Sequence, residues 1–596
     1  MKTKLLSSLV LLFAVLTAHS ANLTVTKAIP TDGASKLALN TRIVLMFGEN
    51  IAKGQASCTL NGQVIDGSIS SKMITFTMPC LNYSTTYEFT APEGAFVSTS
   101  DASKTSPEIK LSFSTLDRPE PTARVFDAIV AQDGSGDYTS IQQAVKAMPE
   151  KRTKPWLVFV KKGYYNEIVR VPDSKPYLHL IGEDSAQTVI AYKINCGFSA
   201  TGGYTGPAEE AETFGNYADQ YNYSYISGSE GESPVFMNKA NNFYMENISL
   251  LNLWGTQDRD YPQALALRTI GDRVALYRCR LYSYQDTWQT ATSSTSRNYA
   301  KDCFIEGNVD FIYDSGDVLL DSCHINIIKN RKPTEEAGWI AAPGNDGAAK
   351  WGYVFKDCYL SAERKGDSIY LGRPWHSSPI CVYINLQLDD KIVLREQGFD
   401  PWYVIPTLFA DWGTRDADGQ LVDRSQRTVN YYDGAGNWKA VQNSITDQEA
   451  ARYTFDNIIP GTDAWRPDIM MERLPAPEAW LNGQTLSWNP VKFAICYEVV
   501  REGEFVCFTT ENSYTTSDQA NYQVRAVNEF GALGQLSSVA TGLQRTAAGP
   551  ARTVVSREYY NLLGQRLENA ETSRQHIAVC RTLWSDGKTT AEKVSY

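Results

Sequence analysis

The sequence predicts an all-β protein whose central part is a parallel β-helix, a solenoid of stacked coils. A short pattern recurs in its middle, and Cys279, Cys303, Cys323 and Cys358 occupy the same place in successive copies. The steps between these cysteines are 24, 20 and 35 residues, which suits coils of about twenty residues joined by loops of variable length. Apolar and polar residues alternate around each cysteine, as they do in strands. We expect the cysteines to lie inside the coil as small apolar residues.

Two copies of this pattern carry an aspartate at the same position. Asp286 stands seven residues after Cys279, and Asp310 stands seven residues after Cys303. Equivalent residues of neighbouring coils stack at roughly 4.8 Å, so we expect the two carboxyl groups to lie on one face. Carboxyl groups that close do not both ionise readily, so the pair can supply an acid and a nucleophile. The alternative is a solvated polar ladder with no role in catalysis.

Further segments identify the region around the repeats. They run in this order: Asp133–Val145, Lys161–Val169, Leu180–Asp184, Gln263–Leu267, Gly271–Trp288, Cys303–Ile312 and Leu371–Trp375. Together they resemble the pectin methylesterase family. The resemblance implies a right-handed parallel β-helix, in agreement with the repeats, and hydrolysis of galacturonate methyl esters in pectin with release of methanol.

The resemblance also implies roles for individual residues. It makes Asp310 the nucleophile and Asp286 the general acid, which later acts as general base. It makes Gln263 and Gln285 stabilisers of the oxyanion, and it places Arg373 beside the nucleophile. A two-bond pair with Arg373 would keep Asp310 ionised and oriented.

The same resemblance gives expectations for substrate contacts. Trp375 would form a wall of the sugar site, and Tyr284 and Phe311 are expected to be further substrate-binding residues. The chain departs from the family at Tyr313-Asp314, where Phe-Gly is usual, and at 341–345, where Thr-Ala-Gln-Gly-Arg is common. These departures bear on substrate preference and leave the catalytic residues in place.

The residue types of the chain favour the same carboxylate chemistry. It has five histidines, all isolated in the sequence, and it lacks a Gly-x-Ser-x-Gly or His-Glu-x-x-His motif. Of the usual routes for hydrolysing an ester, the one that remains uses a carboxylate nucleophile. We therefore expect no metal and no organic cofactor.

The start of the chain has the features of a secretory signal peptide. Lysines precede an apolar run within Met1–Ala21, and small residues follow it. We expect export to the extracellular space or the cell surface, with the periplasm as the alternative. No later segment has the roughly 20 apolar residues of a membrane span, so we expect no integral membrane segment.

Small β domains are expected on both sides of a β-helix domain at 122–470. Residues 22–116 resemble a bacterial Ig-like β-sandwich, in which Cys58 and Cys80 are candidates for a disulfide bond. Residues 474–545 resemble a fibronectin type III module with Trp488 and Tyr522 as core aromatics. The segment 551–596 resembles the C-terminal sorting domains of secreted bacterial proteins; the alternative is a small β appendage.

The net charge of −11 argues against nucleic acid as a partner. It is compatible with pectin, because esterified stretches of homogalacturonan are neutral. We expect a monomer. Two alternatives remain open from the sequence: a lyase-type β-helix enzyme that depends on calcium, and a non-catalytic protein that binds pectin.

Overall fold

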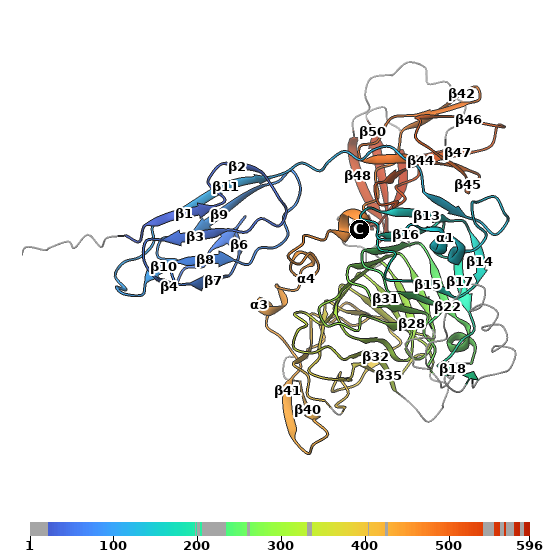
Figure 1. Cartoon of the computed structure of the whole chain (residues 1–596). Helices are drawn as coiled ribbons and strands as arrows, with labels where there is room; N and C mark the ends of the chain where they lie inside the picture. Colours follow the sequence, from blue (N-terminus) through green and yellow to red (C-terminus); the bar gives the residue numbers. More distant parts are fainter. Residues whose placement is uncertain are drawn as a thin grey trace, which may run out of the picture.

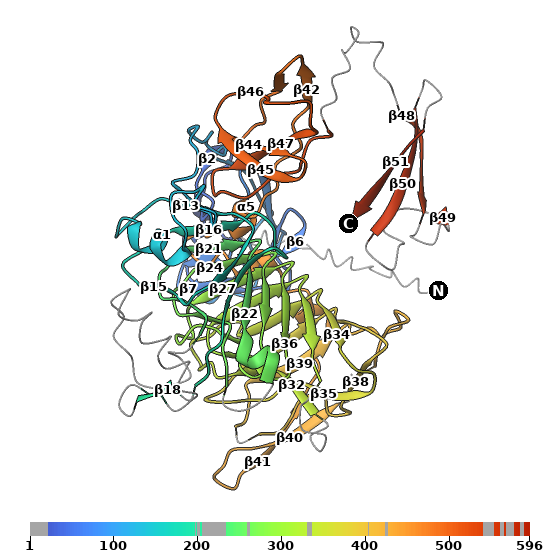
Figure 2. The ribbon, with the colours of Figure 1, turned by 90° about the vertical axis from the view of Figure 1, so that its right-hand side faces the viewer.

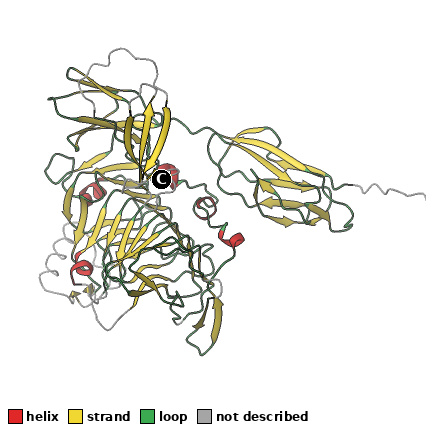
Figure 3. Cartoon of the chain, turned by 180° about the vertical axis from the view of Figure 1, so that it is seen from behind, coloured by secondary structure: helices red, strands yellow, loops and turns green. Residues whose placement is uncertain are grey.

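Strands dominate the computed structural model, as the colouring in Figure 3 shows. It describes residues 22–196, 198–199, 203–204, 234–258, 263–329, 337–402, 404–423, 427–539, 554–560, 566–567, 577–584 and 589–595. The expected signal peptide lies outside these residues. No helix in the described ranges is long and apolar enough to cross a membrane.

Three parallel sheets wind through residues 128–412 and form a β-helix, which confirms the predicted fold class (Figures 1 and 2). From β13 onward each sheet receives one strand in turn, and each strand pairs with its equivalent one coil later. Sheet 1 consists of β12 (Ala128–Val130), β13 (Trp156–Val160), β16 (Leu178–Gly182), β21 (Phe243–Glu246), β24 (Val274–Tyr277), β27 (Arg297–Lys301), β30 (Asp317–Asp321), β33 (Tyr353–Lys356), β36 (Ile380–Ile384) and β39 (Leu408–Trp412). Sheet 2 consists of β14 (Gly163–Asn166), β17 (Thr188–Tyr192), β22 (Ser249–Asn252), β25 (Arg280–Tyr282), β28 (Phe304–Gly307), β31 (His324–Ile327), β34 (Tyr359–Ala362) and β37 (Gln387–Leu388). Sheet 3 consists of β15 (Val169–Val171), β20 (Phe236–Asn238), β23 (Leu267–Thr269), β26 (Trp288–Gln289), β29 (Val309–Asp314), β32 (Ala337–Pro343), β35 (Asp367–Gly372) and β38 (Ile392–Leu394).

Apolar side chains stack in register between the sheets. One such row consists of Leu281, Ile305, Ile325 and Leu360, which pair from coil to coil and are at most 1% exposed. Burying one such side chain contributes about 1.5–3 kcal/mol. The repeat cysteines Cys279, Cys303, Cys323 and Cys358 are buried in the same core without forming disulfides. They therefore pack as small apolar residues, as the sequence predicts.

A short helix closes the first coil. Helix α1 (Ile141–Ala147) begins after Ser140, whose side chain accepts a hydrogen bond from the backbone N–H of Gln143 and caps the helix. Its apolar face, with Ile141 and Val145, packs into the core between the sheets. The helix therefore covers the apolar end of the stack.

A sandwich of two antiparallel sheets follows the coil. It consists of β42 (Ala479–Asn482), β43 (Thr485–Trp488) and β46 (Ser513–Thr515) on one side, and β45 (Glu504–Thr509), β44 (Ala494–Arg501) and β47 (Tyr522–Asn528) on the other. Trp488 and Tyr522 are 2% and 0% exposed, which confirms them as core aromatics. The sandwich packs on sheet 1 through aromatic rings. Phe508 lies 4.4 Å from Phe126, and Phe505 lies 4.8 Å from Phe159 of β13, between ring centres.

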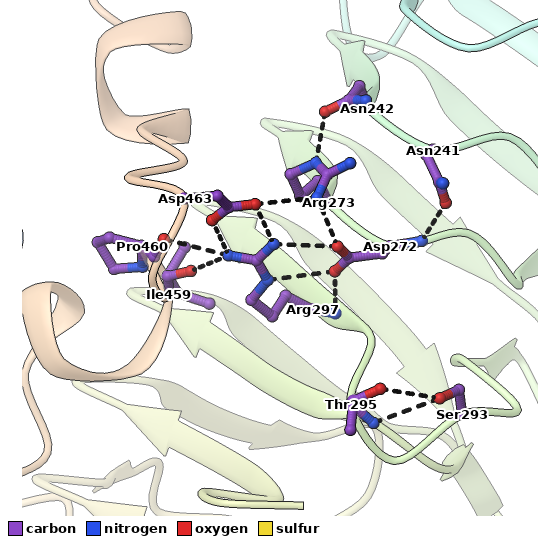
Figure 4. Close-up of polar contacts among 10 residues, drawn as sticks. All are labelled: Asn241, Asn242, Asp272, Arg273, Ser293, Thr295, Arg297, Ile459, Pro460 and Asp463. Atoms are coloured by element: carbon purple, nitrogen blue, oxygen red, sulfur yellow. Dashed lines mark hydrogen bonds and ion pairs between the residues drawn. The ribbon is translucent and has the colours of Figure 1, made fainter. Parts of the chain in front are cut away.

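The segment between the coil and this sandwich is held to the coil by a charged cluster (Figure 4). It carries the short helices α3 (Asp447–Ala450), α4 (Phe455–Ile458) and α5 (Pro467–Met470). Arg297, at the start of β27, donates to the carbonyl oxygens of Ile459 and Pro460 and pairs with Asp463 at 2.7 Å. Asp272 binds the same guanidinium at 3.0 Å. The segment is thereby fixed against sheet 1, where Ile458 and Trp465 lie in one apolar cluster with Tyr299 of β27.

The N-terminal module is a separate β-sandwich at the left of Figure 1. One sheet contains β1 (Val25–Ile29), β3 (Val44–Phe47), β8 (Met73–Phe76) and β7 (Gly67–Ser70); another contains β2 (Ala34–Leu37), β11 (Ile109–Thr115), β9 (Thr86–Ala91), β5 (Thr59–Leu60) and β6 (Gln63–Val64). β10 (Phe96–Ser98) pairs with β4 (Ile51–Lys53). The disulfide considered between Cys58 and Cys80 is wrong, because both are buried thiols. The Cys80 thiol instead faces the carbonyl of Leu81 at 3.6 Å.

Two further antiparallel elements lie outside the coil and the two sandwiches. β40 (Thr428–Tyr432) and β41 (Trp438–Gln442) form a hairpin that projects at the bottom of Figure 1. Near the C-terminus, β48 (Val554–Tyr560), β49 (Arg566–Leu567), β50 (Ile577–Trp584) and β51 (Thr589–Ser595) form a sheet, seen at the right of Figure 2.

Candidate active site

The two repeat aspartates lie side by side on neighbouring coils of sheet 3. Gln285 bridges to Val309, and Trp288 of β26 pairs with Ile312 of β29, both in parallel register. This register sets Asp286 opposite Asp310, as the repeat spacing predicts. Neighbouring parallel strands lie about 4.8 Å apart. The carboxyl groups are therefore within reach of one substrate group.

Both aspartates have the same unusual backbone conformation. Their φ angles are 64° and 48°, in the left-handed region that few residues other than glycine, asparagine and aspartate adopt. Strained positions of this kind are concentrated at functional sites. Asp286 is 4% exposed and Asp310 is 8% exposed. Matching backbone and matching register give the two side chains the same direction away from the coil.

Arg373 binds both oxygens of Asp310. Its Nε donates to Oδ1 at 2.8 Å, and its Nη2 donates to Oδ2. The pair is nearly buried, with 16% of the arginine side chain and 11% of the aspartate side chain exposed. Such two-bond pairs fix orientation as well as charge. The geometry is the one that the sequence led us to expect for Arg373.

The surroundings of Asp310 contain groups that oppose its ionisation and one group that favours it. Burial raises the pKa of Asp310 above its ordinary value, and the negative charge of Asp400 also raises it. The charge and the hydrogen bonds of Arg373 act in the other direction and lower this pKa. The net direction is upward. A carboxylate held ionised by one arginine in a dry site is a better nucleophile than one that water solvates.

Gln263 and Gln285 lie on successive coils beside this pair. The backbone N–H of Ala264, next to Gln263, donates to the carbonyl of Gln285 at 3.3 Å. The carbonyl of Gln263 accepts from the N–H of Cys196 at 2.9 Å. Both glutamines are half-buried. These backbone hydrogen bonds fix the positions of both glutamines in the coil, next to Asp286.

An apolar cluster stands next to these polar residues. Trp375 is half-buried and packs its ring against the edge of Tyr313 at 5.5 Å between ring centres. Leu265 and Ala342 complete the cluster with Tyr313. The wall of a sugar site expected at Trp375 stays a prediction, which rests on the fit of an indole face to the apolar face of a sugar ring.

The structure does not support Phe311 as a substrate contact. Phe311 is fully buried in the core of the coil, where its ring covers Gly307. The physical reason is a local irregularity of β29: its register shifts between Val309 and Ile312, Asp310 has a left-handed φ, and Phe311 and Ile312 both enter the core. Tyr284 is 6% exposed, and its proposed contact with substrate stays a prediction.

Three residues around Arg373 were not identified from the sequence. Trp339 of β32 and Trp402 both lie against the guanidinium, and Asp400 accepts a hydrogen bond from the Trp339 indole N–H at 2.7 Å. The only signal in the sequence was that 399–402 follows Arg373 by the length of one coil. Because the loops between the coils vary in length, this spacing could not be recognised in the sequence.

Comparisons with known proteins place this site in context. A profile of the family described as Pectinesterase matches residues 127–215 and 219–462. One described as a Bacterial Ig-like domain matches residues 19–115. These matches cover the coil and the N-terminal sandwich respectively.

Among curated relatives, a Pectinesterase from Petunia integrifolia is 27% identical over 372 residues, which are 59% of this chain and 86% of the relative. Probable pectinesterase 56 from Arabidopsis thaliana is 30% identical over 283 residues, which are 46% of this chain and 85% of the relative. Other plant relatives are longer, and the chain spans about half of their length (53% and 54%). Among solved structures, a pectin methylesterase from carrot is 23% identical with a TM-score of 0.44, and the match covers 59% of this chain and 98% of that structure.

Proposed function

The chain belongs to the pectinesterase family, and on that premise we propose that it hydrolyses galacturonate methyl esters in pectin, releasing methanol and leaving free carboxylates. The observation that carries this proposal is the arrangement of two aspartates on neighbouring coils, one of which, Asp310, is held by Arg373. It offers a charged nucleophile and a second carboxyl group to one ester.

In the first half of the reaction Asp310 is the nucleophile. A carboxylate oxygen of Asp310 attacks the ester carbonyl carbon, and the carbonyl electron pair moves onto its oxygen. The side-chain amides of Gln285 and Gln263 donate to this oxyanion. When the oxyanion collapses, the bond to the methoxy oxygen breaks, and Asp286 gives its proton to that oxygen. Methanol departs, and the galacturonyl group stays on Asp310 as a mixed anhydride.

In the second half Asp286 acts as a base. Its carboxylate takes a proton from a water molecule, and the hydroxide attacks the galacturonyl carbonyl. The bond to Asp310 breaks, and Asp310 returns to the carboxylate form that Arg373 binds. The sum of both halves is ester plus water to acid plus methanol. Asp286 is again protonated, so the site is ready for another ester.

Substitution of Gln285 tests the oxyanion contact. One oxyanion donor stabilises the transition state by about 3–4 kcal/mol, so Gln285→Ala should lower kcat by about a hundredfold or more with little change in KM. Gln285→Glu is the matched variant, because it keeps the length but places a carboxylate where a donor is needed, and it should be at least as slow. Steady-state methanol release measures both. A change confined to KM would remove Gln285 from this role.

The raised pKa of Asp310 predicts the acid limb of the pH profile. Asp310 must be ionised to attack, so kcat/KM falls as pH falls through its pKa in the free enzyme. Since burial raises this pKa, half of the activity should be lost at a pH above 3.8, the ordinary value for aspartate. Initial rates between pH 3 and pH 8, after a check that the protein stays folded at each pH, give the midpoint. A midpoint below the ordinary value would contradict this environment for the nucleophile.

The activity itself is tested by products. Purified protein incubated with highly methylated pectin should release methanol and titratable carboxyl groups in equal amounts. A lyase would instead form unsaturated products, which absorb in the ultraviolet, and would depend on calcium. A non-catalytic pectin-binding protein would retain pectin and release no methanol. Either result from a folded protein would overturn the proposal.

The flanking parts of the chain complete the proposal. We propose the divisions 22–116, 122–470, 474–545 and 551–596, with a fibronectin type III-like module in the third and a sorting domain in the last. Two three-stranded antiparallel sheets in 479–528 support the third assignment. We further propose that the protein is exported by a signal peptide and acts as a monomer outside the cytoplasm.

A further inference from the structure

Arg373 lies against two tryptophan rings. Its Cζ atom is 4.1 Å from the centre of the Trp402 ring and 4.6 Å from the centre of the Trp339 ring. Both distances are within the range in which an indole face attracts a guanidinium group. The same guanidinium uses Nε and Nη2 to bind Asp310. Arg373 is thus held at once by a carboxylate and by two aromatic faces.

Trp339 is itself fixed in place. Its indole N–H donates to Asp400 Oδ2 at 2.7 Å. Its ring stacks on Tyr370 of β35, with ring centres 6.1 Å apart and planes inclined by 16°. The backbone pairs Trp339 with Tyr370 in register. Hence the ring has little freedom to turn away from Arg373.

Trp402 is positioned by an additional turn of the coil. Gly372, which precedes Arg373, bridges to Phe399 in parallel register, and the N–H of Asp400 donates to the Gly372 carbonyl at 2.9 Å. The N–H of Trp402 donates to the Asp400 carbonyl at 2.9 Å. Trp402 therefore stands one coil beyond Arg373, whereas Trp339 stands one coil before it.

The rings affect the ion pair in two ways. An arginine side chain has many rotamers, and a flat contact on aromatic faces restricts the guanidinium to few of them. The rings also exclude water, and charges attract more strongly where the local dielectric constant is low. Both effects favour the orientation in which Arg373 reaches the two oxygens of Asp310 together.

We propose that Trp339 and Trp402 are positioning residues, which hold the Arg373 guanidinium so that Asp310 stays charged and aimed at the ester. This inference rests on the proposed function of the site, because it takes Asp310 as the nucleophile. It gives the two rings the task of holding Arg373 in place and not of binding the substrate. Asp400 takes part twice: it orients Trp339 through the hydrogen bond, and its charge lies close enough to disfavour ionisation of Asp310.

The charged groups around Asp310 predict that the tryptophan variants and Asp400→Asn shift the pKa of Asp310 in opposite directions. Arg373 lowers the pKa of Asp310 and Asp400 raises it, while Asp286 faces it from the neighbouring coil. Loosening Arg373 through Trp402→Ala or Trp339→Ala should therefore raise the pKa of Asp310. Asp400→Asn removes a negative charge and keeps an oxygen for the Trp339 N–H, so it should lower this pKa.

The test measures the pKa of Asp310 directly and the kinetics beside it. Protein labelled with ¹³C at the aspartate carboxyl carbons is titrated by NMR, and the Asp310 resonance is the one absent from Asp310→Asn. The variants are Trp402→Ala, Trp402→Leu, Trp402→Phe, Trp339→Ala and Asp400→Asn. The control is Trp480→Ala, an exposed tryptophan of β42 in the C-terminal sandwich. Thermal unfolding shows that each variant is folded.

Trp402→Ala and Trp402→Leu should raise the Asp310 pKa by about one pH unit and lower kcat about tenfold, with KM within about twofold. Trp402→Phe keeps an aromatic face and should restore most of kcat. Trp480→Ala should behave as the wild type. If the Asp310 pKa is unchanged in the Ala and Leu variants while KM rises, Trp402 contacts sugar and the positioning role is refuted.

The titration separates this inference from the proposed function. A wild type that releases no methanol would overturn the esterase activity. The Asp310 resonance would still report whether the two tryptophans hold the ion pair, since its pKa does not depend on turnover. If the wild type releases no methanol but the tryptophan variants shift the Asp310 pKa, the positioning role of the tryptophans stands and the esterase activity is rejected. If the Asp310 pKa does not shift, the positioning role is rejected.

Discussion

The Asp310→Asn variant is expected to release methanol from methylated pectin at least about a thousandfold more slowly than the wild type. An amide has nearly the shape of the carboxylate but is not a nucleophile, so the acyl group has no acceptor. Pectin binding should be kept, because the sugar contact proposed for Trp375 is left unchanged. Steady-state kinetics and a binding isotherm on the same preparation measure the two effects.

This variant needs a control for stability. It leaves the Arg373 guanidinium without its charged partner in a nearly buried place, which is destabilising. Thermal unfolding therefore accompanies the kinetics. Asp390→Asn, at an exposed carboxylate, is the matched control and should be fully active. Release of methanol by a folded Asp310→Asn variant at more than about a tenth of the wild-type rate would show that Asp310 is not the nucleophile.

The second large effect is expected for Asp286→Asn. General acid–base catalysis contributes about 10²- to 10⁴-fold, and methoxide is a poor leaving group that needs a proton. We therefore expect kcat to fall by about a thousandfold. An amide cannot deliver that proton or accept one from water, so both halves of the reaction slow down.

The pH profile makes the role of Asp286 specific. In the wild type, kcat/KM should decline on the alkaline side, where Asp286 loses its proton before the ester is bound. In Asp286→Asn the residual activity should lack this decline, while the acid limb set by Asp310 remains. Persistence of the alkaline decline in the variant would assign the general acid to another group.

The repeat pattern was sufficient to predict the coil, because a buried cysteine and alternating residues recur in each turn. It also predicted that Asp286 and Asp310 lie next to each other, since residues at the same position of successive repeats stack whatever the length of the loops between them. The bond between Asp310 and Arg373 joins residues 63 positions apart. The repeat alone does not give it; the resemblance at Leu371–Trp375 did.

Other features depended on details that spacing does not carry. Phe311 follows Asp310 directly, but an irregularity of β29 between Val309 and Ile312 places Phe311 in the core together with Ile312. Trp402 reaches Arg373 only because Phe399 forms an isolated parallel bridge with Gly372, at the end of β35. The packing of Phe505 and Phe508 on sheet 1 joins two domains whose sequences look independent. Each of these depends on which face a side chain takes in the folded coil.

The most direct test of the central claim compares wild type and Asp310→Asn in one methanol-release assay with EDTA present. The carboxylate mechanism predicts that the wild type releases methanol from highly methylated pectin at its full rate with the chelator, and that the variant releases almost none. Loss of wild-type activity in EDTA that calcium restores, or equal release by the two proteins, would contradict ester hydrolysis by the Asp310–Asp286 pair.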